Sequence, residues 1–417
     1  MEITCWYGIQ QNIITVTDKV LRTYGSHNPI FCDLIHFPPG NKYFNEIFGD
    51  PCPGHVKKLF IKFKTEMVFI NENDIHEYTY NISSGKLHNI DHTVFDSIVV
   101  NDFARKDINA YRQHMKSNID NIYKAKKIVT EKDTNYFDLT ILNDIPHIDV
   151  SIVMTTYNRS EQTYFTLQTI MASCQKNLQV IIVDDSNTDL LDLTILEKYG
   201  ICIYHIKTKN KFWFNPCINY NLGFQFIRGQ SIIIQNAEVC HIGDVTDYVV
   251  NHLSNNKYLV FDVAALPSMN INHIFYQSDI SYDNYPNMSQ LFSSWYQHHI
   301  TSTRNLHFLT AIDKQTFDTL DGFDYDFCMG SWYDDNELVF RIEATGIDVI
   351  LVAHNVDKIM GIHQWHVSSM EDWDKNVIRN LELFNAKQQY MTKNKSLFYL
   401  TDYPIADAAI QIDKLFS

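Results

Sequence analysis

Acidic side chains stand in three short stretches of the sequence, two of which follow an apolar run directly. Asp184 and Asp185 end the run LQVIIVDD, Glu238 follows SIIIQNA, and Asp334 and Asp335 open the segment DDNELVF. Adjacent carboxylates at the end of a buried strand are unfavourable unless they are paired or used. Such groups can take a proton from a hydroxyl, accept a nucleobase N–H, or ligate a hard divalent cation. The residue types therefore indicate group transfer from an anionic substrate.

Polar residues that follow the first and third apolar runs extend this set. Thr155, Tyr157 and Arg159 follow the run DVSIVMT, and these side chains could stack on a nucleobase and hold it by hydrogen bonds. Gln235 and Asn236 directly precede the acidic residue of the third stretch. A carboxylate at that point could bind Mg²⁺ or Mn²⁺ bridging a diphosphate.

Each stretch also has a purely structural explanation, because helix capping uses the same residue types. The spacing of Asp334 and Glu337 matches a capping box. His241, three residues after Glu238, is more typical of a surface histidine than of a ligand. The other candidate caps are Asn158 or Ser160 in the first stretch, and Ser186 or Asp189 in the second.

The elements that must position these residues alternate between apolar runs and amphipathic segments from residue 148 onward. This alternation is typical of a mostly parallel sheet covered by helices, in which ligands bind beyond the carboxyl ends of the strands. The strands are expected at Asp149–Thr155, Leu178–Asp184, Ile201–Ile206 and Ser231–Gln235, and the helices at Glu161–Cys174, Leu190–Tyr199 and Pro216–Arg228.

The remaining sequence predicts two further parts. Residues 1–100 contain short β-prone runs separated by Gly, Pro and Asn, which indicates a small antiparallel β domain with a rigid multiple turn at Phe48–Gly54. Residues 101–147 are polar, with helical spacing in Asn109–Ile128, and predict a helical connector. Residues 148–417 form the α/β domain, which ends in a helical tail that includes Glu371–Asn394. The short β-prone runs of the first part are Asn12–Thr17, Ile30–His36, Lys58–Phe63 and Met67–Asn71.

Composition and charge exclude several classes of protein. The chain has 417 residues and a formal net charge of -15, which repels polyanions and argues against a nucleic-acid partner. Its eight cysteines form no C-x-x-C pair, so we expect reduced thiols and no zinc cluster. Neither a leader peptide nor an apolar run long enough to span a membrane is present, which predicts a soluble, cytoplasmic protein.

The first three stretches together resemble the nucleotide-binding half of family 2 glycosyltransferases of the GT-A fold. The matching segments are TTYNR, VDDSN and NPCINYNLGF leading into QNAE. The resemblance implies that Thr155, Tyr157 and Asp185 contact uridine or its equivalent, and that Glu238 stands at the second position of the metal-binding Asp-x-Asp. Two positions depart from the family pattern, since Asn236 replaces its first Asp and Tyr220 replaces an Arg. The wider nucleotide-binding set adds Arg159, Asp184, Asn221, Gln235 and Asn236.

The segment GSWYDDNELVF resembles the acceptor-side motif of the same enzymes. By that resemblance Asp335, with Asp334 beside it, is the general base, and Gly330, Trp332 and Tyr333 shape the acceptor and sugar pocket. His363 fits the position of a further metal ligand, and His366 follows in an H-x-x-H pair that is otherwise an ordinary polar surface. The loop Leu266–Thr303 offers Trp295, Tyr296, His298 and His299 as acceptor contacts.

The resemblance covers residues 148–366 and implies inverting transfer of a sugar from a nucleotide-sugar donor, preferably a UDP-sugar, to a hydroxyl acceptor. A divalent metal, Mn²⁺ or Mg²⁺, would assist. The N-terminal part is similar to a small β domain that accompanies some glycosyltransferases. Asn236 and Ala237 stand where the family has an Asp and its neighbour, so the alternative is a non-catalytic protein that binds carbohydrate or nucleotide. A nucleotidyltransferase is a weaker alternative, because TTYNRSEQ lacks a Gly-rich phosphate loop.

Overall fold

The structure is a computed structural model that describes residues 3–9, 12–17, 19–20, 34–37, 44, 58–63, 66–71, 77–81, 86–90, 112, 115–173, 177–367 and 373–416. The chain divides into two compact units, Met1–Asp107 and Ile108–Ser417, called unit 1 and unit 2 below. Among the described helices, none combines the length and the apolar character needed to cross a membrane.

Unit 1 contains two small antiparallel sheets with strand orders β2-β1-β4-β5 and β3-β6-β7. Cys5 and Tyr7 on β1, and Leu59 and Ile61 on β4, alternate along their strands and are buried, which gives the first sheet one apolar face. The predicted small antiparallel β domain is confirmed, whereas the turn Phe48–Gly54 lies outside the described residues. The strands are β1 Ile3–Ile9, β2 Asn12–Thr15, β3 Leu34–Phe37, β4 Lys58–Phe63, β5 Glu66–Asn71, β6 Glu77–Asn81 and β7 Lys86–Ile90.

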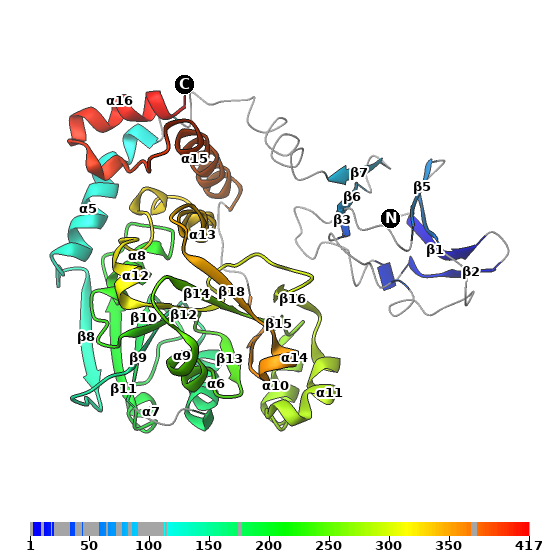
Figure 1. The fold of residues 1–417 in the computed structure, drawn as a ribbon, viewed down its shortest axis with the longest axis horizontal. Coiled ribbons are helices and arrows are strands. Elements are labelled where there is room, and N and C mark those ends of the chain that lie inside the picture. Colours follow the sequence, from blue (N-terminus) through cyan, green and yellow to red (C-terminus); the bar gives the residue numbers. More distant parts are fainter. Residues whose placement is uncertain are drawn as a thin grey trace. The chain divides into compact units, whose positions relative to one another are not determined.

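Unit 2 is built on an eight-stranded sheet with the order β18-β14-β17-β12-β9-β10-β11-β8 (Figure 1). Its centre, β12-β9-β10-β11, is parallel, while β17 and β8 run antiparallel to their neighbours. Every residue of β10 is buried, as continuous apolar strands covered on both faces require. The strands are β8 Phe137–Leu142, β9 Val150–Thr156, β10 Leu178–Asp184, β11 Cys202–Thr208, β12 Ser231–Asn236, β14 Lys257–Phe261, β17 Leu309–Asp313 and β18 Asp348–Val352.

Helices cover both faces of this sheet, and alternate strand residues divide between two cores. Val153 and Ile181 belong to the core shared with α5, α8, α13, α15 and α16, whereas Ile152 and Val180 belong to the core shared with α6, α7 and α9. The predicted α/β architecture with a mostly parallel sheet is therefore confirmed. The helices are α5 Ile119–Thr130, α6 Ser160–Ser173, α7 Leu193–Glu197, α8 Cys217–Phe224, α9 Val245–His252, α10 Met269–Tyr276, α11 Tyr285–Met288, α12 Lys314–Asp318, α13 Asp334–Ala344, α14 His354–Asp357, α15 Trp373–Asn394 and α16 Ile405–Leu415, with short 3-10 turns η1 Tyr282–Asn284, η2 Ser289–Leu291, η3 Tyr325–Phe327 and η4 Leu400–Asp402.

A second, smaller sheet in unit 2 has the order β13-β19-β15-β16. Its strands are β13 Val239–Ile242, β15 Val263–Ala265, β16 Ser294–Gln297 and β19 Met360–His363. Register places Val239, which directly follows Glu238, opposite His363. This small sheet therefore joins two of the predicted metal-ligand positions.

The described part of the predicted connector, residues 101–147, is built into unit 2 instead of standing apart. Helix α5 packs against α8 and α16, and β8 pairs with β11 as the edge strand of the large sheet (Figure 1). Leu139 and Ile141 on β8 are exposed. An edge strand with one solvated face carries only a weak apolar pattern, which explains why the sequence did not predict it.

A buried ionic cluster ties α15 to the segment before α13. The ammonium of Lys387 pairs with Asp324 and lies 2.6 Å from Asp326 Oδ2, and it donates to the Phe398 carbonyl at 2.7 Å. Burial and the charge of Asp324 raise the pKa of Asp326 to about 7, although Lys387 opposes this rise. Helix α15 is therefore anchored to the body of unit 2 by charge as well as by apolar contact.

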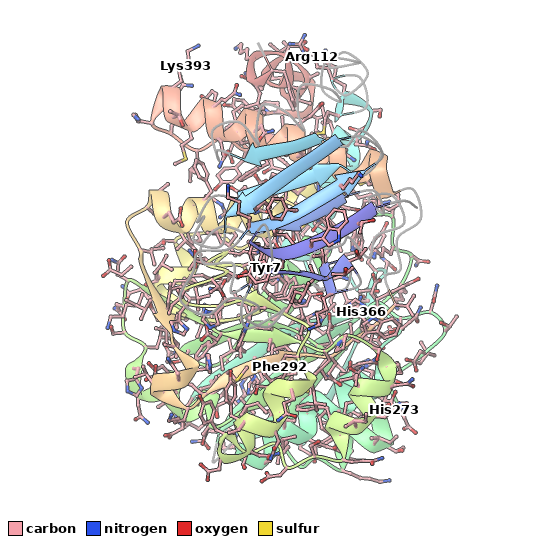
Figure 2. All side chains as sticks on the ribbon, turned by 90° about the vertical axis from the view of Figure 1, so that its right-hand side faces the viewer. Tyr7, Arg112, His273, Phe292, His366 and Lys393 are labelled. Atoms are coloured by element: carbon pink, nitrogen blue, oxygen red, sulfur yellow. The ribbon has the colours of Figure 1, made fainter. Side chains whose placement is uncertain are left out.

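Replacing this cation should strongly destabilise unit 2. Lys387→Met leaves two buried carboxylates without their partner, and breaking a buried pair in this way typically costs about 3–5 kcal/mol. Urea unfolding followed by circular dichroism measures the loss. Lys393→Met, at an exposed position of the same helix (Figure 2), should stay within about 0.5 kcal/mol of the parent protein. Equal stability of the two variants would contradict the anchoring role.

Candidate active site

The carboxyl ends of four parallel strands meet at one edge of the large sheet. Thr156 on β9 pairs with Asp184 on β10, and Asp184 pairs with Lys207 on β11. On the other side of β9, Thr155 pairs with Asn236 on β12. The residues expected from the strand ends are therefore adjacent in space, as the prediction required.

The loop after β9 is fixed by hydrogen bonds to the loop after β10. Asn158, at φ 51°, accepts the backbone N–H groups of Asn187, Thr188 and Asp189 at 3.0 to 3.2 Å. The Asp189 carboxylate accepts the Ser160 N–H at 2.8 Å. Helix α6 is thus capped by a residue of the neighbouring loop, and Asp189 does not cap the helix that follows it.

The rigid first loop leaves two predicted nucleotide contacts partly accessible. Thr155 and Tyr157 are both half-buried. The Thr155 hydroxyl also hydrogen-bonds with the buried Tyr220, whose pKa is raised mainly by burial and lowered by this bond. The loop therefore presents a hydroxyl and an aromatic ring beside the sheet edge.

Asp184, the first acid of the VDDSN stretch, is held inside the protein. It is 1% exposed, accepts the Ser186 N–H at 2.8 Å, and lies 3.1 Å from His205 Nε2. Burial acts to raise the pKa of Asp184, but hydrogen bonds from His205 and Ser186, with Lys207 nearby, lower it overall. This carboxylate organises the loop from within.

Asp185, the second acid, lies closer to the surface and is partly accessible. Its Oδ1 accepts the Thr208 hydroxyl at 2.7 Å, and its Oδ2 pairs with Lys211. A carboxylate has about four acceptor positions, so further hydrogen bonds can form. The two adjacent acids thus have different surroundings, since Asp184 lies within the protein and Asp185 lies beside Lys211 with 9% of its side chain exposed.

The end of β12 is organised by Tyr220 and His241. The Gln235 side chain is fully buried between His241 Nε2 at 2.7 Å and the Val239 carbonyl at 3.0 Å. The Tyr220 hydroxyl donates to the Gln235 carbonyl at 2.9 Å and lies 3.4 Å from Asn236 Oδ1. His241, favoured as a surface residue, is instead buried, which lowers its pKa to about 3. Gln235 therefore stabilises the turn, and Asn236 stays partly exposed.

Glu238 lies at the centre of a cluster of nitrogen groups. Its Oε1 is 2.7 Å from Arg159 Nη1 and 3.3 Å from Nε2 of both His363 and His366. Its Oε2 is buried and has no hydrogen-bond partner within the described chain. The resemblance gave His363 as a ligand, and the structure adds His366 to the same group. The pair lies at a strand end and in the following loop and is largely buried, so it does not form an ordinary polar surface.

The electrostatics of this cluster suit a cation. Burial acts to raise the pKa of Glu238, but Arg159 and the two imidazoles hold it well below its usual range. Burial lowers the pKa of His363, which favours the neutral imidazole that a metal needs. The carboxylate and both imidazole nitrogens lie within 4.8 Å of one another. The donor set and the unpartnered oxygen fit a divalent metal ion.

The acceptor-side acids open α13. Asp334 is 3% exposed and accepts the Asn215 amide at 2.9 Å, while Asp335 is half-buried and accessible. Trp332 and Tyr333, at φ 64° and 62°, adopt the left-handed conformation that such residues rarely occupy. No capping box forms, because the cap residue is Tyr333 and Glu337 instead pairs with Arg341. The strained turn leaves Trp332 50% exposed beside the acids.

A side chain of helix α15 supports this strained turn by hydrogen bonds. The Asn380 amide donates to the carbonyls of Trp332 at 2.9 Å and Phe327 at 3.1 Å. A Cβ at Gly330 would lie 2.1 Å from the Asn380 side-chain oxygen. Gly330, predicted as part of the acceptor pocket, is therefore required by this contact with α15.

Glu238 and Asp335 act on the same pair of buried rings. Tyr220 and His307 lie with ring centroids 4.9 Å apart. Burial is the main cause that raises the pKa of Tyr220 and lowers that of His307, and the charges of Glu238 and Asp335 act on both groups. Carboxylates from two distant parts of the sequence thus influence the same ring pair.

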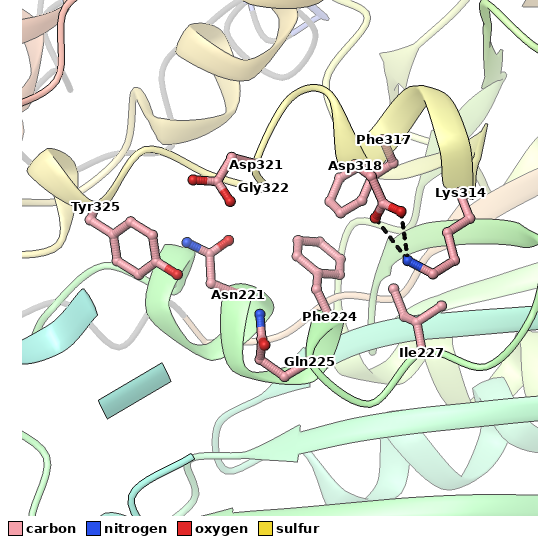
Figure 3. A pocket seen from close by; sticks show the side chains of 10 residues that line it. All are labelled: Asn221, Phe224, Gln225, Ile227, Lys314, Phe317, Asp318, Asp321, Gly322 and Tyr325. Atoms are coloured by element: carbon pink, nitrogen blue, oxygen red, sulfur yellow. Dashed lines mark hydrogen bonds and ion pairs between the residues drawn. The ribbon is translucent and has the colours of Figure 1, made fainter. Parts of the chain in front are cut away.

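Asn221, a predicted nucleotide contact, is committed elsewhere. Its amide donates to the Phe323 carbonyl at 2.7 Å and accepts the Phe323 N–H at 2.8 Å. It also lines a cavity of about 100 Å³ between α8 and α12, in which Phe224, Gly322 and Tyr325 are further walls (Figure 3). No other predicted site residue lines this cavity.

Three residues of the site were not predicted from the sequence. His307 is a lone histidine before β17, Asn215 lies in a matched motif whose function was not assigned, and Asn380 lies outside the resemblance. Only Asn215 carried a usable signal, because it stands at the start of NPCINYNLGF. The other two act through contacts that no spacing reveals.

A mostly parallel sheet with carboxylates and imidazoles at its carboxyl edge agrees with the predicted GT-A fold. Residues 151–317 match the family model described as Glycosyl transferase family 2. This part of the chain is accordingly similar to family 2 glycosyltransferases, and the predicted resemblance is confirmed.

Individual relatives are distant. An uncharacterised glycosyltransferase of Rickettsia conorii is 23% identical over 120 residues, and the match covers 28% of this chain and 19% of that protein. A mannosyltransferase of Pyrobaculum calidifontis, solved with GDP-Man and Mn²⁺, is similar with 13% identity over 73% of this chain and 80% of that chain, at a TM-score of 0.36. TarS of S. aureus is similar with 12% identity over 59% of this chain and 44% of its own, at a TM-score of 0.37.

The buried acid Asp334 should make stability depend on pH. Burial and the neighbouring Asp335 raise its pKa to about 7, above the unfolded value of about 3.9. The folded state therefore holds this proton more tightly, and the stabilisation present at low pH is lost progressively as the pH rises from about 4 to about 7. Asp334→Asn keeps the acceptor for Asn215 and should remove this loss.

Urea unfolding of the parent and Asp334→Asn proteins between pH 5 and 8 measures the effect. The free energy of unfolding of the variant should gain on the parent as the pH rises, by up to about 1.4 kcal/mol per pH unit. Asp348→Asn, at an exposed position on β18, is the matched control and should follow the parent. Parallel curves for Asp334→Asn and the parent would contradict the raised pKa.

Proposed function

We propose that this protein transfers a sugar from a nucleotide-sugar donor to a hydroxyl acceptor with inversion at the anomeric carbon. The observation that carries the proposal is that one short segment contacts both sides of the site, since Asn215 donates to Asp334 at 2.9 Å and Tyr220 donates to the Gln235 carbonyl at 2.9 Å. The match of residues 151–317 to the family 2 model supports glycosyl transfer as the reaction class. Each half of the site then has a distinct role.

Asp335 is the general base of the proposed reaction. It is half-buried at the start of α13, whereas Asp334 is buried and held by Asn215. The acceptor oxygen attacks the anomeric carbon as its proton passes to the Asp335 carboxylate. The new C–O bond forms as the bond to the diphosphate oxygen breaks on the opposite face, which inverts the configuration and releases the nucleoside diphosphate.

The donor nucleotide lies at the sheet edge. Tyr157 offers a ring for the base, Thr155 a hydroxyl, and Asp185 a carboxylate that suits the imide N–H of uracil, so we favour a UDP-sugar. Lys211 beside Asp185 and the guanidinium of Arg159 add positive charge on that side of a protein with a net charge of -15. The exposed Trp332 offers a ring for the sugar or acceptor.

Glu238, His363 and His366 would hold the divalent metal. Two imidazoles with one carboxylate favour Mn²⁺ or another transition metal ion over Mg²⁺, which prefers oxygen ligands. When bound, such an ion neutralises the charge that develops on a departing diphosphate. The guanidinium of Arg159 pairs with the Glu238 oxygen that also faces the two imidazoles, so it places a positive charge beside the proposed metal site.

This ion pair also supports the alternative of a non-catalytic protein that binds a nucleotide or carbohydrate. A guanidinium bonded to Glu238, together with Asn236 at the first Asp position, is compatible with a site that needs no metal. Such a protein would bind UDP and leave every UDP-sugar intact, even with Mn²⁺ and varied acceptors. Release of UDP from a donor separates the two functions.

Replacing the base should stop transfer without preventing donor binding. Asp335→Asn removes the proton acceptor, and we expect the transfer rate to fall by about 10²–10⁴ while UDP affinity changes less than about twofold. Coupled assay of UDP release and calorimetric UDP binding measure the two quantities. Asp348→Asn, an exposed acid of unit 2, should leave both unchanged. A variant at Asp335 that turns over at the parent rate would exclude this residue as the base.

Replacing the central carboxylate should remove metal-dependent binding. Glu238→Gln keeps the size of the side chain but loses its charge, so the rise in melting temperature caused by UDP with Mn²⁺ should fall towards that of UDP alone. A thermal-shift screen of UDP, GDP and dTDP also identifies the base. Glu161→Gln, an exposed position on α6, is the control. An Mn²⁺ titration that is the same for Glu238→Gln and the parent would place the ion elsewhere.

A further inference from the structure

A second group of ligand-type side chains lies at the opposite end of the small sheet. Asp262 stands between β14 and β15, His298 and His299 follow β16, and His354 opens α14. Asp262 and His354 lie where the chain passes from the large sheet to the small one, and His298 and His299 follow the edge strand of the small sheet. His298 and His299 were predicted as acceptor contacts, and the structure directs them to this group.

Asp262 is the centre of the group. It is 1% exposed, and its Oδ2 lies 2.6 Å from His299 Nδ1 and 2.7 Å from His354 Nδ1. The backbone N–H of His299 donates to Oδ1 at 2.6 Å, and that of His354 donates to Oδ2 at 3.0 Å. Two imidazoles are therefore aimed at one carboxylate oxygen, with their backbones fixed to the same side chain.

His298 supplies a third imidazole. Its ring lies against that of His299, with centroids 4.4 Å apart, and its Nδ1 accepts the N–H groups of Ile300 and Thr301 at 3.1 and 3.3 Å. One ligand atom from each of the four side chains lies within 4.8 Å of the others.

Aromatic rings enclose the group. Trp295 stacks on His354 with centroids 5.0 Å apart, and Tyr285 lies 5.1 Å from the same ring. Tyr282 packs against Tyr285 at 5.3 Å. Such walls restrict water and lower the local dielectric, which strengthens binding between a cation and a buried carboxylate.

We propose that Asp262, His299 and His354, with His298 as the fourth ligand, form a structural binding site for a divalent transition metal ion of the zinc class. Three imidazoles and one carboxylate are ligands that Zn²⁺ accepts in four-coordinate sites. The site is separate from the Glu238 group and does not rest on the proposed sugar transfer.

The geometry requires only small movements. Ligand atoms about 2.0–2.1 Å from a tetrahedral zinc are about 3.3 Å apart, so the two Nδ1 atoms must each move roughly 0.6 Å away from Asp262 Oδ2. The ring proton of His299 and of His354 shifts from Nδ1 to Nε2, and the freed lone pair faces the ion. His298 gives up its two backbone bonds if it binds through Nδ1.

The position gives such an ion a mechanical role. Val263, which follows Asp262, pairs with Gly361 on β19, and Ala265 pairs with His363. At about 3.3 Å per residue, Asp262 lies roughly 10 Å along the strand from the register position of His363. The ion would fix the loops at one end of the sheet whose other end carries two side chains of the Glu238 group.

Metal uptake by the full-length protein tests the proposal without an activity assay. The chelator-stripped double variant His363→Gln/His366→Gln removes the imidazoles of the first group and serves as the background. We expect it to bind one equivalent of Zn²⁺, measured by competition with a chromophoric chelator, and to give a tetrahedral Co²⁺ spectrum. Adding His299→Gln or His354→Gln should weaken zinc binding roughly 100-fold.

The matched control is His273→Gln in the same background, since His273 is about half-exposed on α10 and lies outside both groups (Figure 2). It should leave uptake unchanged. Circular dichroism without metal verifies that each variant is folded, and His299→Gln, at the more exposed position, decides if His354→Gln does not fold. If neither folds, uptake by the background protein decides. The proposal would be overturned if the background protein took up no stoichiometric zinc, or if His299→Gln left the uptake unchanged. Asp262 would then only hold the loops by hydrogen bonds.

Discussion

The buried charge of Glu238 is the constraint on which the rest of the site depends. An isolated carboxylate at this depth would cost several kcal/mol, so it must be matched by nearby positive or hydrogen-bonding groups. Arg159 comes from the loop before α6, and His363 and His366 come from the end of β19. These groups reach Glu238 only if the small sheet is packed closely against the large one. Gly361 shows how closely, since a Cβ there would lie 3.1 Å from Cδ2 of Leu309 on β17 of the large sheet.

The acid that opens α13 is also buried and also has a partner, but that partner is neutral. Asp334 is buried and is compensated by a neutral amide, Asn215, which belongs to the loop after β11. A neutral partner leaves the proton affinity of this acid high, whereas the charged partners of Glu238 keep that carboxylate ionised. These two acids therefore have opposite protonation tendencies. The left-handed turn at Trp332 and Tyr333 keeps the next acid, Asp335, accessible.

The sequence predicted well what short-range patterns encode. Strands β9, β10 and β12 are continuous apolar runs, so both their existence and the edge where their polar ends meet could be inferred. Edge strand β8 was missed because one of its faces is solvated. The cap of α6 was missed because Asp189 reaches it from another loop. The Asp262 group could not be predicted either. His299 and His354 lie 37 and 92 residues after Asp262, and these separations match no spacing that indicates metal ligands. Pairing between polar groups on loops that are distant in sequence forms only in the folded chain, so sequence patterns do not reveal it.

The contact between Asn380 and Gly330 also bears on how the molecule is made. A chain emerges from the ribosome from its N-terminus, and early segments fold as they appear. Strands β9 to β12 can assemble while α15 is still inside the ribosome, but the turn beside Asp335 lacks the support of α15 until Asn380 has emerged. The sheet edge is thus made before the turn at the start of α13 is held in place by the C-terminal part of unit 2.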